Sequence, residues 1–146
     1  MFLMGTCCHC ANAHIMNWNQ FKNMIIANLE DSFLSREWFH KKYEENDPRF
    51  VDVTFGHCYL ATEVAYHLLG GKEEGWKPYQ LNQDGESHWF LKHDSGFLLD
   101  ITSGQFGGAP INYGGARGKG FLTKAPSKRA KLLMLKIKTY LGKNNI

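Results

Sequence analysis

Three side chains of this sequence have the types and the order found in activated-cysteine sites: Cys58, His88 and Asp100. A cysteine is a strong nucleophile only as the thiolate. A neighbouring imidazole can take the thiol proton, while a carboxylate orients the imidazole and stabilises its charge. Each residue taken alone is more often a core cysteine, a strand histidine or an edge carboxylate. A catalytic triad is therefore predicted only if the fold brings all three together.

Cys58 stands where an extended, glycine-marked stretch (residues 50–56) gives way to a helical pattern that Gly70–Gly71 stops. We expect Cys58 on the buried side of the first turn, because it precedes the apolar stripe at helical spacing. A helix N-terminus lowers the pKa of a thiol through its free amides and dipole. The Cys58 backbone N–H is also a candidate oxyanion-hole donor. The apolar stripe consists of Ala61, Val64, Ala65 and Leu68.

Three antiparallel strands are predicted next, over 76–81, 87–92 and 97–102, with a turn-rich connection at 82–86. A three-residue loop at 94–96 places His88 opposite Thr102, whereas a loop at 93–95 places it opposite Asp100. Both registers put His88 and Asp100 on one sheet face, with Cβ atoms about 4.5 to 8 Å apart. A two-residue loop would separate them. Asp94-Ser95-Gly96 favours a three-residue turn with glycine at the bulge position.

Other histidines compete with His88 for the role of general base. His57 is adjacent to the thiol, but consecutive residues at a helix start point in different directions. His67 lies nearly three turns further along the predicted helix, and His93 lies in the hairpin turn. His88 is therefore the predicted base.

The order of a helix-borne Cys58, a strand His88 and an Asp100 on the next strand resembles papain-like and transglutaminase-like thiol hydrolases, most closely the transglutaminase core and the NlpC/P60-like branch. Residues 54–105 carry this resemblance, and the strings G-H-C-Y-L-A-T-E, S-H-W-F-L and L-D-I-T also resemble uncharacterised small proteins encoded by bacteriophages. The resemblance implies a cysteine-dependent hydrolase or acyl transferase that acts on amide, isopeptide or peptide bonds.

The same resemblance implies roles for residues around the three. In papain-type enzymes a polar donor precedes the nucleophile, and here His57 or the more distant Gln105 would supply it. Tyr59 stands where a tryptophan often flanks the cysteine, and Trp89 follows the histidine instead. The implied substrate is a protein or a peptide-like molecule.

The chain before Cys58 has two predicted helices and a leader. Asn17 and Gln20 form a capping-box pattern that opens one helix, and 35–45 is a second, which Asp47-Pro48 ends. His40 is interpreted as a surface residue of the second helix. Residues 1–16 are predicted to be a disordered leader. A zinc site there is the lesser alternative, because adjacent cysteines do not readily share one tetrahedral ion; its ligands would be Cys7, Cys8, His9, Cys10 and His14.

The chain after Asp100 contains no acid and nine Lys or Arg residues, whereas the chain through Asp100 has a net charge of −6. Residues 103–122 are glycine-rich and predicted to be a long irregular loop. Within them Arg117 and Lys119 lie in a stretch, 114–120, that could cover the active-site cleft as a mobile lid or bind an acidic group. A closing helix is predicted from Pro126 or Ser127 to Leu141, ended by Gly142, with lysines opposite its apolar face: Ala130, Leu133, Ile137 and Leu141.

This basic C-terminal region supports an alternative function. The protein would be a non-catalytic binding protein, such as a phage-encoded inhibitor of a host factor, that uses residues 117–143 to bind an acidic partner surface. Nucleic acid is not favoured as the partner, since no aromatic residues alternate with the basic ones. No cofactor is predicted, because no glycine-rich phosphate loop follows a strand.

With 146 residues, of which 43% are hydrophobic and 21% charged, the chain has the composition of one soluble domain. It lacks a signal-peptide pattern and any apolar run long enough to span a bilayer. The clustered cysteines suit a reducing compartment, so a cytoplasmic protein is expected, in a host cell if a phage encodes it. The predicted fold is α+β: residues 17–146 form one domain, in which N-terminal helices and the Cys58 helix pack on a small antiparallel sheet and a basic amphipathic helix ends the chain.

Overall fold

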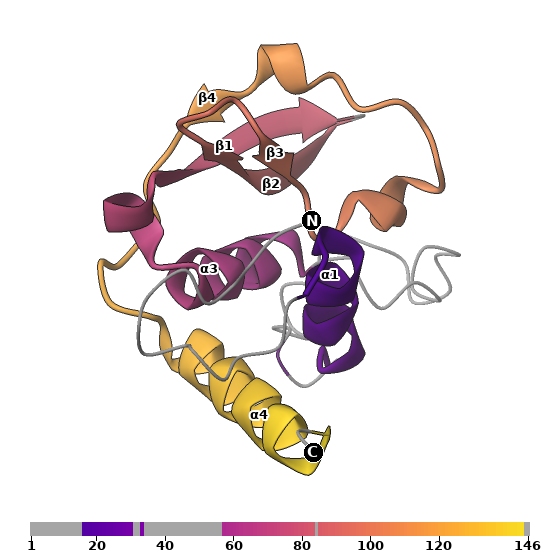
Figure 1. Cartoon of the computed structure of the whole chain (residues 1–146). Helices are drawn as coiled ribbons and strands as arrows, with labels where there is room; N and C mark the ends of the chain where they lie inside the picture. Colours follow the sequence, from indigo (N-terminus) through magenta and orange to yellow (C-terminus); the bar gives the residue numbers. More distant parts are fainter. Residues whose placement is uncertain (1–15, 31–32, 34–56, 84, 145–146) are drawn as a thin grey trace.

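The computed structural model describes residues 16–30, 33, 57–83 and 85–144, and their fold is α+β, as expected (Figure 1). The described part contains three α-helices: α1 (Trp18–Ala27), α3 (Cys58–Leu68) and α4 (Lys128–Asn144). It also contains a four-stranded antiparallel sheet of β1 (Trp76–Gln83), β2 (Glu86–His93), β3 (Leu98–Leu99) and β4 (Arg117–Gly118), in the order β3-β2-β1-β4.

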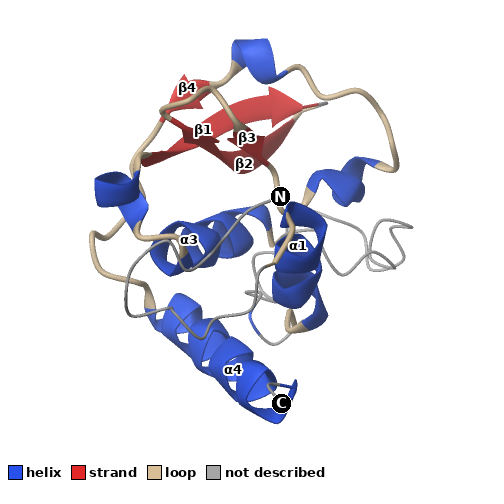
Figure 2. Cartoon of the chain, viewed as in Figure 1, coloured by secondary structure: helices blue, strands red, loops and turns tan. Residues whose placement is uncertain are grey.

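These elements form layers, with α3 between the sheet and α4 and with α1 beside α3 (Figures 1 and 2). One hydrophobic cluster joins the sheet to all three helices. The sheet supplies Trp76, Leu91 and Leu99, the turn after β3 supplies Ile101, and the helices supply Phe21, Met24, Ile25, Leu60, Ala61, Val64, Ala65, Ala130, Leu133 and Ile137. The helix that carries Cys58 is therefore buried between the sheet and α4, and apolar burial holds it against β2.

The predicted start of the first helix is confirmed. The Asn17 side chain accepts a hydrogen bond from the Gln20 N–H, and the Gln20 side chain accepts one from the Asn17 N–H, at 2.8 and 3.0 Å. This reciprocal pair satisfies two N–H groups that the helix itself leaves without acceptors. Apolar residues at helical spacing in this segment are buried: Phe21, Met24, Ile25 and Leu29.

The predicted stop of α3 is also confirmed. Gly70 follows the last helical residues with a φ of 90°, in the left-handed region that favours glycine. A Cβ atom there would lie 2.3 Å from Cγ of Glu74, so no larger residue fits without movement.

The hairpin that joins β2 to β3 has a three-residue loop at 94–96, which is the first of the two predicted registers. Leu91 pairs with Leu99 and Lys92 with Leu98, and the His93 N–H donates to the Phe97 carbonyl at 2.8 Å. The third strand is much shorter than the predicted 97–102. Its ladder ends at Leu99, because Ile101 and Thr102 already form the turn that leads into a 3-10 helix, Ser103–Phe106.

The first hairpin also differs from its prediction. β1 and β2 pair along their whole length, from Trp76 with His93 to Gln83 with Glu86. The expected connection at 82–86 is therefore only a two-residue loop at 84–85, in which Gly85 has a φ of 81°. This φ lies in the region that two-residue hairpin loops require.

The glycine-rich segment 103–122 is more regular than predicted. It contains two 3-10 helices, Ser103–Phe106 and Tyr113–Gly115, and then β4, whose residues Arg117 and Gly118 pair with β1. β4 forms through main-chain hydrogen bonds to β1. It has only two residues, which are too few to show the alternating side-chain pattern of a strand in the sequence. The expected lid stretch 114–120 thus includes an edge strand of the sheet.

The closing helix is confirmed, with two corrections. Ser127 caps it, since the Ser127 Oγ accepts a hydrogen bond from the Ala130 N–H at 3.2 Å, and α4 begins at Lys128. Gly142 does not end it, because the helix continues to Asn144. Leu141 is 36% exposed rather than buried, because it lies beyond the part of α4 that packs against the core, whereas Ala130, Leu133 and Ile137 are fully buried as predicted.

Several predictions fall outside the described residues: the leader and its zinc ligands, the helix at 35–45 with His40, and the extended run at 50–55. Among the helices that the structure does describe, none is both long and apolar enough to cross a membrane.

Candidate active site

Cys58 is the first residue of α3, where backbone N–H groups have no intrahelical acceptors. The helix begins here because the His57 carbonyl accepts from the Ala61 N–H at 2.8 Å while His57 itself has a non-helical ψ of 5°. Cys58 is 8% exposed, and its Sγ donates to the Ser87 carbonyl at 3.5 Å. The predicted inward position of Cys58 on the first turn is therefore present, and the thiol lies against the start of β2.

His88 and Asp100 are in direct contact. His88 Nε2 donates to Asp100 Oδ2 at 2.6 Å, and the two side chains are 0% and 6% exposed. The register of the hairpin explains the contact, because both residues project from the same face of the sheet. Burial makes this bond strong, since a short charge-assisted hydrogen bond is poorly screened away from water.

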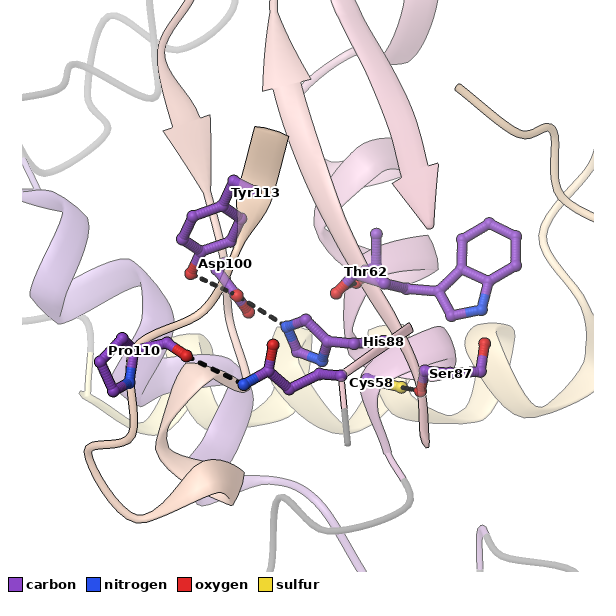
Figure 3. A network of polar contacts seen from close by, with 9 residues as sticks. Cys58, Thr62, Ser87, His88, Asp100, Pro110 and Tyr113 are labelled. Atoms are coloured by element: carbon purple, nitrogen blue, oxygen red, sulfur yellow. Dashed lines mark hydrogen bonds and ion pairs between the residues drawn. The ribbon is translucent and has the colours of Figure 1, made fainter. Parts of the chain in front are cut away.

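The second ring nitrogen of His88, Nδ1, is buried and has no well-aligned hydrogen-bond partner in the described part of the chain. Cys58 lies beside this ring, on the side away from Asp100 (Figure 3). Burial disfavours the charged ring, but hydrogen bonding and charge from Asp100 and Cys58 outweigh it and raise the pKa of His88 to about 9. The three predicted residues thus meet, with His88 between the thiol and the carboxylate.

A fourth side chain, Tyr113, joins this group and was not predicted. Its hydroxyl donates to Asp100 Oδ2 at 2.7 Å, and burial together with Asp100 raises the pKa of Tyr113 (Figure 3). The signal in the sequence was weak: Tyr113 is the single tyrosine of the long glycine-rich segment that follows Asp100. Nothing in its spacing shows that the segment folds back over the sheet.

The chain from Asp100 through the 3-10 helix Ser103–Phe106 adds an aromatic edge and buried polar atoms. The Phe106 ring meets the His88 ring edge-on at 4.9 Å. Thr102 Oγ1, Gln105 Oε1 and Asp100 Oδ1 are buried without hydrogen-bond partners among the described residues. Buried polar atoms are usually satisfied, so unpaired acceptors beside a reactive group leave capacity to bind donors. Gln105, an expected oxyanion donor, is next to Phe106 in this 3-10 helix, and it is Phe106 whose contact with His88 the structure describes.

The other histidines are engaged elsewhere. His57 is fully buried, and its Nε2 donates to the Glu30 carbonyl at 3.0 Å. His67 lies in the last turn of α3, where burial lowers its pKa. His93 contacts the Glu74 carbonyl and Ser95 in the hairpin. Of the histidines that the structure describes, His88 is the one that contacts both Cys58 and Asp100.

Tyr59, Trp89 and Phe121 form an aromatic cluster next to β2. The Tyr59 ring meets Trp89 and Phe121 edge-on, and the Tyr59 hydroxyl accepts from the Leu122 N–H at 2.8 Å. Lys119 Nζ lies 5.8 Å from the centroid of the Trp89 ring, within cation–π range. Tyr59 and Trp89 therefore hold the chain that follows β4, which includes Lys119, against the sheet. Arg117 is exposed in β4 and has no described contact with Cys58 or His88.

The described residues contain no group of three or more His, Cys, Asp or Glu side chains that could hold a metal ion.

Comparisons of the chain with protein-family models, with curated proteins and with solved structures find no match. The case for a function therefore depends on the arrangement of Cys58, His88, Asp100 and Tyr113.

Proposed function

We propose that the protein is a cysteine-dependent hydrolase or acyl transferase that acts on amide, isopeptide or peptide bonds, with Cys58 as the nucleophile. The observation that carries this proposal is the contact of one buried histidine with both Cys58 and Asp100, at the N-terminus of a helix. His88 is the proton carrier and Asp100 its orienting acid. In papain-like and transglutaminase-like folds a similar helix packs on an antiparallel sheet, and we propose a core of that type.

The reaction begins when the Cys58 thiol proton leaves its hydrogen bond to the Ser87 carbonyl for His88, which gives a thiolate and an imidazolium. With its pKa raised to about 9, His88 holds a proton at neutral pH, and that proton is the one removed from the Cys58 thiol. The thiolate attacks the carbonyl carbon of the substrate and forms the C–S bond. The N–H groups of the first turn of α3, including that of Cys58, have no intrahelical acceptors and are the proposed donors to the oxyanion.

His88 then donates its proton to the leaving nitrogen, and the C–N bond breaks to give a thioester and a free amine. Neutral His88 next takes a proton from the incoming water or amine, which attacks the thioester carbon. The thiolate leaves as the new C–O or C–N bond forms, and the imidazolium is restored. Asp100 stays ionised throughout and stabilises the charged ring.

Alkylation with iodoacetamide tests the proposal, because the reagent reacts with thiolates. Peptide mapping by mass spectrometry separates Cys58 from Cys7, Cys8 and Cys10, which serve as reference thiols in the same sample. At pH 6.5 we expect Cys58 to react about ten times faster than the reference cysteines, since an ordinary thiol with a pKa of about 8.5 is largely protonated there.

The matched variant is His88→Gln, which keeps a polar side chain but removes the titrating ring. It should bring the alkylation rate of Cys58 at pH 6.5 down to that of the reference cysteines or below. Equal rates for Cys58 in the wild type and in His88→Gln would show that no imidazole activates the thiol, and would overturn the proposal.

The basic C-terminal helix favours a second candidate, a binding protein for an acidic partner. Its outward residues Leu132 and Leu135 are 51% and 61% exposed, and the exposed Lys128, Lys131 and Lys138 accompany them. An apolar centre with a basic border is typical of surfaces that bind an acidic groove. In this case Cys58→Ala would leave the function intact, whereas charge reversal on α4 would abolish it.

Lys128 and Lys131 are suitable positions for that charge reversal. Arg129 is not, because its guanidinium donates to the Phe33 carbonyl at 2.6 Å and its replacement would also perturb packing. If the acidic partner is nucleic acid, the affinity should fall steeply as salt rises, because bound counterions are released.

A further inference from the structure

Asp100 has two hydrogen-bond donors on one oxygen. His88 Nε2 and the Tyr113 hydroxyl both donate to Oδ2, at 2.6 and 2.7 Å (Figure 3). The other carboxylate oxygen, Oδ1, is buried without a partner among the described residues. The imidazole and the phenol therefore share one oxygen of a buried carboxylate, and the charge on that oxygen couples the two hydrogen bonds.

Several contacts from different parts of the sheet hold Tyr113 in this position. Its ring packs edge-on against Phe90, with centroids 5.0 Å apart. Before it, the Pro110 carbonyl accepts from Gln83 Nε2 at 2.9 Å, and after it β4 pairs with β1. The segment that carries Tyr113 is thus fixed on both sides of the residue, and the phenol is not a freely moving surface group.

We propose that Tyr113 is a positioning residue for the candidate active site: by donating to the oxygen that also accepts from His88, it limits how tightly Asp100 holds the His88 proton. The role rests on the proposed function, because a proton carrier matters only if Cys58 is a nucleophile.

The physical reason is the distribution of negative charge. A hydrogen bond to a carboxylate withdraws charge from the accepting oxygen, and less charge remains to stabilise the adjacent imidazolium. His88 must both keep a proton in the resting state and release it to the leaving nitrogen. If His88 were the single donor to the carboxylate, His88 would keep its proton more firmly and release it less readily to the leaving nitrogen. Burial and the charge of Asp100 keep the phenol protonated, so it remains a donor over the working pH range.

The variant Tyr113→Phe removes the hydroxyl and keeps the ring that packs on Phe90. We expect the pKa of His88, followed by NMR of its ring, to rise above the wild-type value of about 9. The expected rise corresponds to an affinity for the proton about threefold higher. An unchanged or lowered pKa would overturn the proposal, because a ring that acts by packing alone leaves the charge on Asp100 as it was.

Tyr79→Phe is the matched control. Tyr79 also packs on Phe90, with stacked rings 5.8 Å apart, and its hydroxyl makes no hydrogen bond within the part of the chain that the structure describes. This control should leave the pKa of His88 unchanged. A rise equal to that in Tyr113→Phe would mean that packing on Phe90, and not the hydroxyl, sets the pKa, and would also overturn the proposal.

A second measurement covers the case in which Tyr113→Phe fails to fold. In a titration of the tyrosine ring carbons by NMR, Tyr113 should ionise well above the ordinary pKa of about 10, and should return toward it in Asp100→Asn. Ordinary titration of Tyr113 in the wild type would remove the basis of the proposal.

These readouts are separate from that for the proposed function, because none of them requires a reactive thiol. If Cys58 is inert while the His88 pKa responds to Tyr113→Phe, the hydrolase proposal fails and the control by Tyr113 stands. If Cys58 reacts rapidly while the His88 pKa does not respond, the assignment of Tyr113 fails and the hydrolase proposal stands.

Discussion

The buried carboxylate of Glu63 accepts two hydrogen bonds from Ser127, one from the backbone N–H and one from the hydroxyl, both of 2.8 Å. Glu63 belongs to α3, and Ser127 is the N-cap of α4, where it also accepts from the Ala130 N–H. The negative charge of Glu63 therefore lies at the positive end of the α4 dipole. This pair joins the helix that carries Cys58 to the closing helix.

Ser127→Ala should lower the free energy of unfolding by about 1 to 2 kcal/mol, because it removes an N-cap and leaves Glu63 with one donor fewer. Glu63→Ala should cost more, about 2 to 3 kcal/mol, since it leaves both Ser127 groups without their acceptor. Urea denaturation measures both values. Two equal losses would mean that the carboxylate contributes nothing beyond its bond to the hydroxyl.

Two adjacent leucines of α4 should respond differently to truncation. Leu133 is fully buried, so Leu133→Ala should lower the free energy of unfolding by about 2 to 5 kcal/mol. Leu132 is 51% exposed, and Leu132→Ala should change it by about 0.5 kcal/mol or less. Thermal and urea denaturation of the two variants test the orientation of α4. A larger loss in Leu132→Ala would mean that the helix presents another face to the core.

Stability should fall between pH 6.5 and about 9. The folded-state pKa of His88 is about 9, above the ordinary 6.5, so the folded protein binds the extra proton more tightly than the unfolded chain. The contribution of this proton to the free energy of unfolding is fully present below pH 6.5 and is lost as the pH rises through 9. Its size is on the order of 3 kcal/mol, and urea denaturation at pH 6 and pH 9.5 measures it.

Asp100→Asn provides the control for this pH dependence. Without the carboxylate the imidazolium loses its hydrogen-bonded anion, so the free energy of unfolding should change much less between pH 6 and pH 9.5. Groups remote from Asp100 have the same surroundings in both proteins, and their effect cancels in the comparison. Parallel curves for the two proteins would contradict the assignment to His88.

The hairpin that joins His88 to Asp100 depends on Gly96, which has a φ of 94°. Gly96→Ala should lower the free energy of unfolding by about 1 kcal/mol, because a residue with a Cβ is strained in this region. Gly104→Ala is the matched control: Gly104 has an ordinary φ, and an added Cβ meets nothing within 4 Å. It should be neutral or slightly stabilising. Equal losses in both would argue against the strained turn.

The hairpin is also where the sequence was most informative about the site. Asp94-Ser95-Gly96 limits the loop to few conformations, and alternation along the strands then decides which side chains share a face. The contact between His88 and Asp100 follows from these two local rules. The position of Cys58 on α3 follows from helical periodicity in the same way.

Tyr113 and β4 could not be predicted by such rules. Their place depends on where a glycine-rich segment meets the sheet, and glycine constrains that path less than any other residue. Likewise, the early end of β3 and the exposure of Leu141 are set by neighbouring elements, because tertiary packing decides where a ladder or a buried helix face ends.

The spacing of the site residues along the chain has a consequence for the order of folding. His88 and Asp100 are 12 residues apart and Asp100 and Tyr113 are 13 apart, whereas Cys58 and Ser87 are 29 apart. Short loops close at low entropic cost, so the imidazole, carboxylate and phenol can assemble within one local stretch before α3 docks on the sheet. Rapid alkylation of Cys58 during refolding would then mark the last step, the arrival of the nucleophile at acid–base groups that are already in place.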